Sequence, residues 1–274
     1  MVNRLSKPGI VVWLLLLATL TGCVKKSGDG IVFRKKADLS PVVCKADSIA
    51  LPFLFYSERW FLSHGDLYVL NSRATPFLTI YSLPEQRVRT QWGNSGRGPH
   101  EFPIPSLGEM HEKNRVAVYS NSLNRMEMFE LRADSLVYLS AFRFPIWMKR
   151  QRNLPKPYTR LVQYNDTLFV GTSFLPRQIA VELLDMRNEQ IVDAVDFPLR
   201  PADGGYSAPF ECKAALCAGR MAIAYRYIDR IELYDLTPKG FCLTHVLGSD
   251  SAQEELCAQD RDDEMYFYYS DVVC

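Results

Sequence analysis

The sequence predicts an all-β protein, a β-propeller with blades of about 50 residues, because one strand-rich pattern recurs along it. The recurrences occupy residues 65–93, 114–144, 166–197 and 219–248. Equivalent positions are spaced 49, 52 and 53 residues apart, at Val69, Val118, Val170 and Ile223. Within each repeat, apolar and polar residues alternate with period two, and no sustained helical pattern follows residue 22. A β-sandwich with evenly spaced strands is the alternative, but it does not predict the repeat.

The composition is that of a globular chain without a strong global charge. Lys and Arg number 32 against 31 Asp and Glu, a formal net charge of +1, and hydrophobic residues make up 47% of the chain. A balanced charge gives no field that would attract nucleic acid, so no nucleic-acid partner is expected. Any charged site must therefore be local.

The first 22 residues have the features of an export signal. Arg4 and Lys7 precede the apolar run GIVVWLLLLATLTG, which is short for a membrane span. The run ends in LTGC, which resembles the bacterial lipobox, and this resemblance implies that Cys23 is lipidated and becomes the first mature residue. An ordinary signal cleavage site that happens to precede a cysteine is the alternative.

This interpretation divides the chain into three parts. Residues 1–22 form a lipoprotein signal peptide, residues 23–44 a lipid-anchored tether and first strand region, and residues 45–274 the propeller domain. The tether begins with the polar segment VKKSGDG, and no acidic run directly follows Cys23. We therefore expect an envelope protein held in the outer membrane by its lipid, on the periplasmic side.

Six further cysteines follow Cys23, and export permits their oxidation. Six cysteines allow 15 full pairings, and the sequence selects none of them. The segment CKAALC (212–217) has four residues between its thiols and no nearby histidine, which argues against a metal or redox site. Buried thiols or one local disulfide are expected there.

The glycine-rich segment WGNSGRGPHEF (92–102) lies between two predicted blades. Its glycines are ordered G-x-x-G-x-G and strands follow, whereas nucleotide-binding loops run G-x-G-x-x-G into a helix or close on Lys-Ser or Lys-Thr. A crossing from the rim of one blade to the centre of the next is expected instead. Gly93, Gly96 and Gly98 would permit positive φ there, and Pro99 would fix the exit from the turn.

The elements GRGPHEF and PIP resemble the G-x-G-P-G-E-F…P element of NHL-type and TolB-like propellers. Together with the lipobox, they resemble the TolB-like six-bladed propeller lipoproteins of Gram-negative bacteria, over most of residues 45–273. His100 replaces the family's glycine. The resemblance implies a six-bladed plan and an envelope address, and no settled activity.

The length of the chain does not match six complete blades. Six blades of this period need roughly 300 residues, whereas 252 follow the signal. The four full repeats are followed by EMYFYYSDVVC (264–274), which begins like a further blade. Truncation of a six-bladed plan is expected, with five closed blades as the alternative. An open edge would favour self-association and fast hydrogen exchange after residue 219.

No catalytic or metal motif stands out in the sequence. The four histidines lie far apart, and DRDDE (260–264) lacks the alternate ligand spacing of a calcium loop. No nucleophile elbow occurs. We therefore expect no metal and no cofactor.

The predicted crossings supply the candidate ligand-binding residues, because all crossings of a propeller emerge at one end. A basic and aromatic cluster lies in WMKRQRNLPKPYTR, and a third crossing contains ADGGYSAP (202–209). Charge and aromatic stacking there would suit an anionic or sugar-like ligand. A solvated loop is the alternative. The candidates are Arg97, His100, Trp147, Arg150, Arg152, Lys156 and Tyr206.

These features favour a non-enzymatic, membrane-anchored lipoprotein whose propeller binds a protein, peptide or glycan. The rival hypothesis is a propeller-type glycan hydrolase or lyase that uses carboxylates or His100 from the crossings. A pair of acidic side chains about 5 to 10 Å apart in the mouth would favour the rival.

Overall fold

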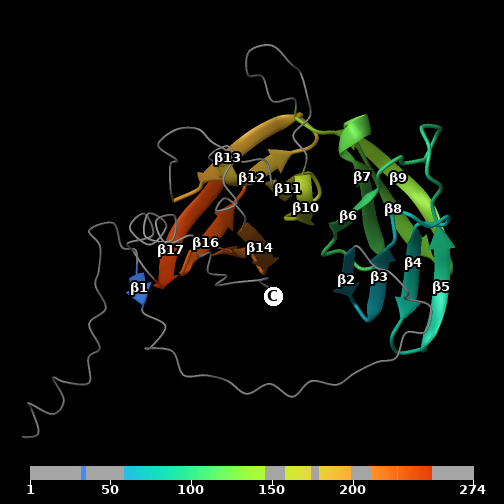
Figure 1. Cartoon of the computed structure of the whole chain (residues 1–274), viewed down its shortest axis with the longest axis horizontal. Coiled ribbons are helices and arrows are strands. Elements are labelled where there is room, and N and C mark those ends of the chain that lie inside the picture. The colour runs from blue at the N-terminus through green and yellow to red at the C-terminus, as the bar shows by residue number, and fades with distance from the viewer. Residues whose placement is uncertain are drawn as a thin grey trace, which may run out of the picture.

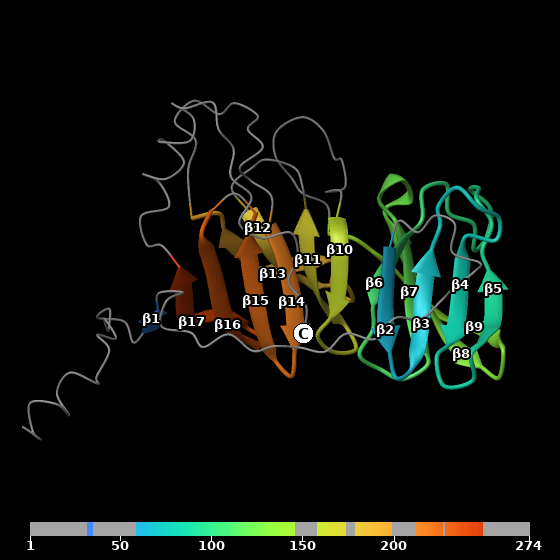
Figure 2. The ribbon, with the colours of Figure 1, turned by 60° about the horizontal axis from the view of Figure 1, so that its bottom comes forward.

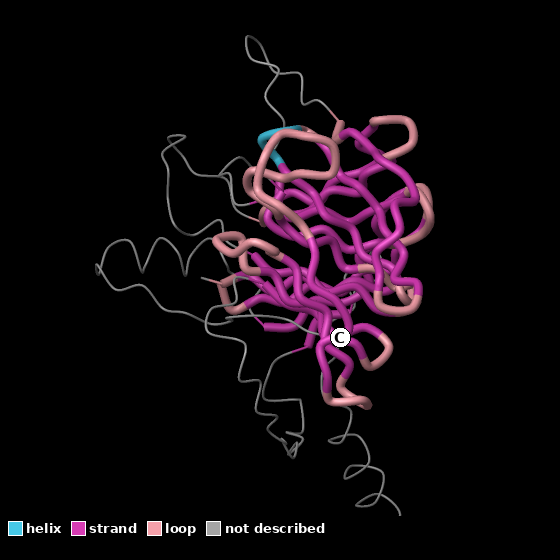
Figure 3. Tube along the Cα trace, turned by 90° about the vertical axis from the view of Figure 1, so that its right-hand side faces the viewer, coloured by secondary structure: helices cyan, strands magenta, loops and turns pink. Residues whose placement is uncertain are grey.

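A computed structural model describes residues 32–34, 59–145, 158–173, 179–198, 212–226 and 228–248. These residues form four sheet units of four antiparallel strands each, which follow one another around an arc (Figure 1). The helical content of the described residues is one 3₁₀ turn, η2 (Asn121–Leu123), and the rest of them form strands joined by loops and turns (Figure 3). The predicted all-β propeller fold is thereby confirmed.

Each unit is a blade in which the four strands follow one another from the centre of the arc to its rim (Figure 1). Blade 1 contains β2 (Arg59–Ser63), β3 (Asp66–Leu70), β4 (Leu78–Ser82) and β5 (Arg87–Trp92). Blade 2 contains β6 (Ser106–Glu109), β7 (Arg115–Ser120), β8 (Arg125–Arg132) and β9 (Ser135–Arg143).

The other two blades repeat this order. Blade 3 contains β10 (Tyr158–Gln163), β11 (Leu168–Ser173), β12 (Ile179–Asp185) and β13 (Gln190–Asp196). Blade 4 contains β14 (Cys212–Cys217), β15 (Arg220–Tyr225), β16 (Arg230–Thr237) and β17 (Gly240–Gly248). A short strand, β1 (Val32–Arg34), pairs in parallel with β17 and makes this sheet five-stranded.

Apolar side chains pack in the interface between each pair of neighbouring blades. Phe61, Ile80 and other residues of blade 1 pack against Val118 and Phe129 of blade 2 in one cluster. A methionine-rich cluster joins blades 2 and 3, and a third cluster joins blades 3 and 4. Each cluster draws on alternate residues of the strands, because successive side chains of a strand point to opposite faces. Successive residues of β7 and β8 therefore enter two different clusters, so both faces of this inner blade are buried.

Blades 2 and 3 are also joined by backbone hydrogen bonding between their innermost strands. β6 pairs in parallel with β10, with Gly108 opposite Leu161, so the two blades form one eight-stranded sheet. Arg160 reinforces this pairing with two hydrogen bonds to Glu109, from Nε to Oε1 at 2.7 Å and from Nη2 to Oε2 at 3.1 Å. Figure 2 shows β10 beside β6 from a second direction.

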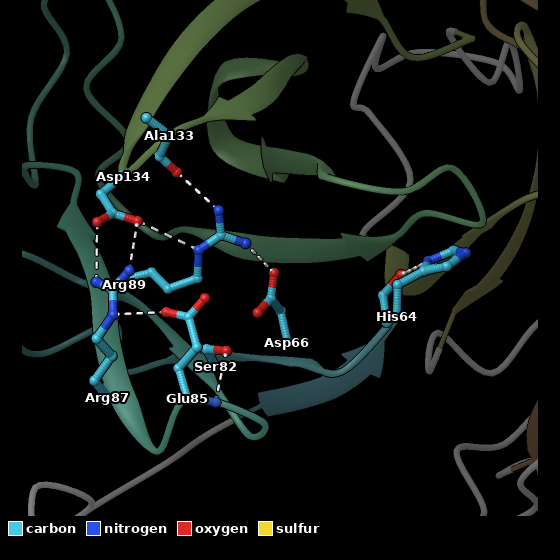
Figure 4. A network of polar contacts seen from close by, with 9 residues as sticks. His64, Asp66, Ser82, Glu85, Arg87, Arg89, Ala133 and Asp134 are labelled. Carbon is cyan, nitrogen blue, oxygen red and sulfur yellow. Dashed lines mark hydrogen bonds and ion pairs between the residues drawn. The ribbon is translucent and has the colours of Figure 1, made fainter.

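At the rim, a polar network joins blade 1 to the β8–β9 turn of blade 2 (Figure 4). Arg87 Nη1 donates to Asp134 Oδ2 at 2.9 Å, and Arg89 Nη2 donates to the carbonyl oxygen of Ala133 at 2.8 Å. Arg89 Nη1 also reaches the buried carboxylate of Asp66 at 2.5 Å. The hydrogen bond from Arg87 holds the pKa of the Asp134 carboxyl below its usual value.

Four strands per blade give the fold two unlike ends. The turns β2–β3, β4–β5 and their equivalents lie at the hairpin end, and the crossing from β5 to β6 lies at the opposite, crossing end together with the β3–β4 and β7–β8 connections. The crossing from β5 to β6 spans residues 93–105, where the glycine-rich segment predicts it. Among the described residues, no helix is long and apolar enough to cross a membrane.

Candidate functional site at the first crossing

The crossing between blades 1 and 2 is folded back on itself and anchored by an aromatic side chain. Asn94 and Glu101 form an isolated parallel bridge, and the Phe102 N–H donates to the Asn94 carbonyl oxygen at 3.1 Å. Phe102 is fully buried and meets the Phe77 ring edge-on, with a centroid separation of 6.2 Å. The burial of Phe102 therefore anchors the loop formed by residues 94–101, the tip of this crossing, to the core of blade 1.

The glycines in this crossing serve two different purposes. Gly93 has a φ of +98°, and a Cβ there would lie 2.3 Å from the Phe77 ring, so both conformation and space require glycine. Gly96 and Gly98 do not adopt the left-handed region, contrary to expectation. Instead they make room for Glu101, whose Oε2 accepts the Gly98 N–H at 2.9 Å and would lie 2.1 Å from a Cβ on Gly96.

The left-handed residue in the tip is His100, with a φ of +57°. This conformation is uncommon for a residue with a Cβ, and it explains why glycine suits the position in the pattern that GRGPHEF resembles. The backbone conformation of His100 therefore costs conformational free energy. Its side chain remains 48% exposed.

A buried carboxylate from blade 2 holds the His100 ring. Nδ1 of His100 lies 2.6 Å from Oε2 of Glu127, whose side chain is 4% exposed. The other oxygen, Oε1, lies 3.0 Å from Nε of Arg125. Arg125 in turn donates from Nη2 to the Glu101 carbonyl oxygen at 2.7 Å and places its guanidinium 4.9 Å from the Phe102 ring centroid. Blade 2 thus fixes both the tip of the crossing and the orientation of the histidine.

Aromatic rings surround the histidine. The Tyr138 ring on β9 is centred 4.9 Å from the His100 ring, and Tyr138 is 45% exposed. Beneath both rings lies the buried ring of Phe129, whose centroid is 6.1 Å from each of them. Trp92, at the end of β5, packs on Phe129 from the blade 1 side, at 4.4 Å. His100 and Tyr138 therefore form an exposed pair on a rigid aromatic base.

Glu127 belongs to a set of buried glutamates that recur in the third strand of three blades. Glu127, Glu182 and Glu232 lie opposite Val118, Gly171 and Ile223 of the second strands, and all three are nearly inaccessible. Directly opposite residues of neighbouring strands share a face, and Val118 and Ile223 belong to the interblade clusters. Glu127 and Glu232 therefore face the preceding blade. In blade 1, the residue opposite Val69 is Thr79.

The partners of these glutamates differ between blades. Glu182 Oε2 accepts the Tyr158 hydroxyl at 2.7 Å. Glu232 Oε2 accepts the hydroxyls of Tyr225 and Tyr234, both at 2.7 Å, and its Oε1 accepts from Arg230 Nε at 2.7 Å. Burial, followed by the nearby carboxylate, raises the pKa of each of these tyrosine hydroxyls.

Only two of the predicted ligand-binding residues lie in the described part of the chain. Arg97 and His100 are exposed in the first crossing, as expected of surface residues. Ligand binding by them stays a prediction. The remaining predicted positions lie outside the described residues, and these are Cys23, Trp147, Arg150, Arg152, Lys156 and Tyr206.

Sequence reasoning missed Glu127, Arg125 and Tyr138, the residues that complete the site. A signal was present, because RMEMFEL (125–131), AVELLDM (180–186) and RIELYDL (230–236) each place a glutamate where strand alternation predicts a core position. A core glutamate indicates a specific polar partner, since an unpaired buried charge is costly. The partner from the crossing, however, is separated from Glu127 by 27 residues.

The cysteines of β14 behave differently from one another. Cys212 is a buried thiol, as expected, whereas Cys217 is disulfide-bonded. The alternative prediction of a local disulfide within CKAALC is therefore wrong. The two residues lie at opposite ends of the strand, so their side chains are too far apart to bridge. No group of three or more His, Cys, Asp or Glu side chains that could hold a metal ion occurs in the described ranges.

Comparisons with known proteins assign this chain to no family. No family model matches the sequence, and no curated protein matches it. Similar solved structures include a Bacteroides fragilis protein assigned to export (TM-score 0.48, 14% identity) and the WD40 domain of Toxoplasma gondii coronin (TM-score 0.45, 11% identity). Another is the β-propeller domain of Myceliophteria thermophila Cps50 (TM-score 0.39, 10% identity).

The alignments cover only part of each protein. They include 70%, 71% and 70% of this chain and 50%, 46% and 71% of the three structures, in the same order. This chain therefore spans about half the length of the first two. Identities and TM-scores are too low for these likenesses to carry an argument about function. The propeller assignment rests on the four blades themselves.

Proposed function

We propose that this chain is a lipid-anchored binding module of the bacterial envelope, whose crossing end binds a protein, peptide or glycan. The observation that carries the proposal is the His100 site. It combines an exposed imidazole, an exposed tyrosine ring and a buried carboxylate that fixes the imidazole. Side chains held in one orientation lose little freedom when a ligand binds, which favours affinity.

The sequence supports the anchor. Cys23 follows an apolar run in a lipobox-like context, and several acyl chains on one cysteine would give stable membrane binding. The Cys23→Ala variant should be released from membranes or accumulate unprocessed, which membrane fractionation with immunoblotting measures. A processed variant that stays firmly membrane-bound would contradict the anchor.

The binding end can be tested by site-specific photo-crosslinking in membranes. A photoreactive amino acid at Arg97, in the first crossing, should capture a defined envelope component. The same group at Lys239, exposed in the β16–β17 turn at the hairpin end, is the matched control. Equal capture at both positions, or none at Arg97, would contradict binding at the crossing end. The basic cluster around Arg150 would add charge to this end if it joins the same site.

One observation favours the rival activity of a glycan hydrolase or lyase. A histidine whose Nδ1 is held by a carboxylate is also the arrangement of a general base. Incubation of the protein with neutral oligosaccharides, followed by mass spectrometry of the products, separates the two functions. Binding without cleavage supports the module, and cleavage that is lost in His100→Gly supports the enzyme.

A further inference from the structure

The Glu127 carboxylate determines which lone pair His100 presents to solvent. An ionised carboxylate only accepts hydrogen bonds, so at the 2.6 Å contact the Nδ1 of His100 is the donor. In the neutral ring, the proton on Nδ1 leaves Nε2 as an acceptor. Among the described residues no hydrogen bond to Nε2 is found, and the side chain is 48% exposed. The neutral form of His100 therefore offers a hydrogen-bond acceptor to a ligand.

Tyr138 supplies the second part of the site. Its ring lies 4.9 Å from that of His100, and Phe129 supports both rings from below. An exposed aromatic ring on a rigid base is a flat apolar surface, suited to a flat apolar ligand face. A sugar ring combines such a face, made of C–H groups, with hydroxyl groups that donate hydrogen bonds. Tyr138 and His100 match these two features.

The charged side chains in contact with the site argue for a neutral ligand. Arg125 is already engaged by Glu127, by the Glu101 carbonyl oxygen and by the Phe102 ring. Two carboxylates also belong to the site: Glu127 contacts the His100 ring, and Glu101 follows His100 in the chain and accepts the Gly98 N–H. An anion would therefore meet an acceptor at Nε2 and nearby negative charge. A ligand hydroxyl can instead donate to Nε2.

We propose that His100 and Tyr138 bind a neutral sugar residue, with a sugar hydroxyl donating to His100 Nε2 and a sugar face stacked on Tyr138. The inference rests on the proposed function, because it names the ligand class of the same site. It replaces the broader expectation of an anionic or sugar-like ligand with a neutral one.

The test uses the mature chain with Cys23 replaced by alanine and a panel of neutral oligosaccharides. The panel holds hexamers of glucose in α-1,4 and β-1,4 linkage, of xylose, of mannose and of N-acetylglucosamine, and saturation-transfer NMR detects binding. Two variants remove the proposed contacts, His100→Gly and Tyr138→Ala. Glycine suits the positive φ of residue 100, so the first variant should keep its fold.

His64→Gly is a matched control. His64 is also an exposed histidine with positive φ, 52°, but it lies in the β2–β3 turn at the hairpin end. Tyr138→Phe is a second control, which keeps the ring and removes only the hydroxyl. Both controls should bind as the parent protein does.

At least one hexamer should bind the parent, and His100→Gly and Tyr138→Ala should each weaken it about tenfold, the usual effect of losing one contact of this size. Unchanged melting temperatures would assign the losses to binding. Binding of no hexamer, or equal losses in His64→Gly, would overturn the inference. So would preference for sulfated or uronic acid probes, with affinity that falls as salt rises. Continued capture at Arg97 after such a failure would leave the proposed function intact.

Discussion

Glu127 in blade 2 and Glu232 in blade 4 occupy the same position of the repeat, yet their surroundings differ. Both side chains are at most 5% exposed. Within the described residues, the hydrogen-bond partners of Glu232 come from its own blade, namely Tyr225, Tyr234 and Arg230. Glu127 has Arg125 from its own blade and a half-exposed histidine from the crossing. The Glu232 carboxylate is enclosed by side chains of its own blade (the closed site), whereas the Glu127 carboxylate is linked to the surface through His100 (the open site).

The difference shows how a structural position can acquire a surface role. Each third-strand glutamate needs partners because it is buried. In blade 4 two tyrosines and an arginine satisfy that need without involving solvent. In blade 2 the partner comes from the loop that precedes the blade, so the same carboxylate both supports the interface and fixes an exposed imidazole. We infer that the stability of the closed site and the ligand binding of the open one can be changed separately.

The largest expected effect is the loss of the closed carboxylate. Glu232→Ala leaves Arg230 and two tyrosine hydroxyls without their buried acceptor, which should lower the free energy of unfolding by about 3–5 kcal/mol. Urea unfolding followed by tryptophan fluorescence measures the change. A loss below about 1 kcal/mol would place Glu232 among weak surface ion pairs and would remove the contrast with Glu127.

The second effect is sensitivity to alkali at the closed site. The pKa values of Tyr225 and Tyr234 are raised above 10.0, so the folded state keeps both neutral while the unfolded chain ionises them above pH 10. The unfolded state then binds fewer protons, and stability falls as pH rises. Each tyrosine should cost about 1.4 kcal/mol per pH unit above 10.

The control for this effect is Tyr234→Phe, which removes one of the two titrating hydroxyls and keeps the ring. The pH-dependent loss of stability between pH 10 and about 11 should become smaller by one tyrosine's share. Unfolding midpoints in urea at each pH give the slope. An unchanged slope would mean that Tyr234 ionises in the folded protein as it does in the unfolded chain.

A smaller effect is expected at the open site. Glu127→Ala should lower the free energy of unfolding by about 1–3 kcal/mol, because water can replace the carboxylate at the half-exposed His100. Sugar binding should weaken as well, since the imidazole loses its fixed orientation. Urea unfolding and saturation-transfer NMR measure the two effects. A stability loss equal to that of Glu232→Ala would contradict the distinction between the sites.

The smallest effect on stability is expected for His100→Gly. Glycine relieves the left-handed backbone, worth about 1 kcal/mol, and this gain offsets the lost contact with Glu127. The net change should lie within about 1 kcal/mol, as differential scanning calorimetry can show. A loss of several kcal/mol would make His100 chiefly a structural residue.

The repeat was enough to predict the fold class, because period-two alternation and a spacing near 50 residues both follow from stacked blades. The innermost strands were harder to predict. SLGE (106–109) and CKAALC (212–217) contain glycine and alanine, which seldom indicate strands. Gly108 of β6 is needed within its own blade, where a Cβ would lie 3.0 Å from the Ala117 side chain of β7, whereas Leu161 of β10 would be at an ordinary contact distance of 3.8 Å.

The site was only half predictable for a similar reason. The crossing and its exposed His100 follow from local signals, namely glycines, a proline and a break in alternation. The position of Glu127 follows from the third-strand pattern, but its pairing with His100 depends on how the loop folds back over blade 2. That path is fixed by the burial of Phe102 and by Arg125, contacts that no spacing in the sequence encodes.

The most direct test of the account is the tautomer of His100. Long-range ¹H–¹⁵N NMR of the neutral imidazole rings distinguishes Nδ1–H from Nε2–H, and His100→Gly identifies the His100 signals. The account predicts a proton on Nδ1 and an unprotonated Nε2 whose signal shifts when a neutral oligosaccharide is added. A proton on Nε2, or a rapidly averaged mixture like that of a free histidine, would contradict it.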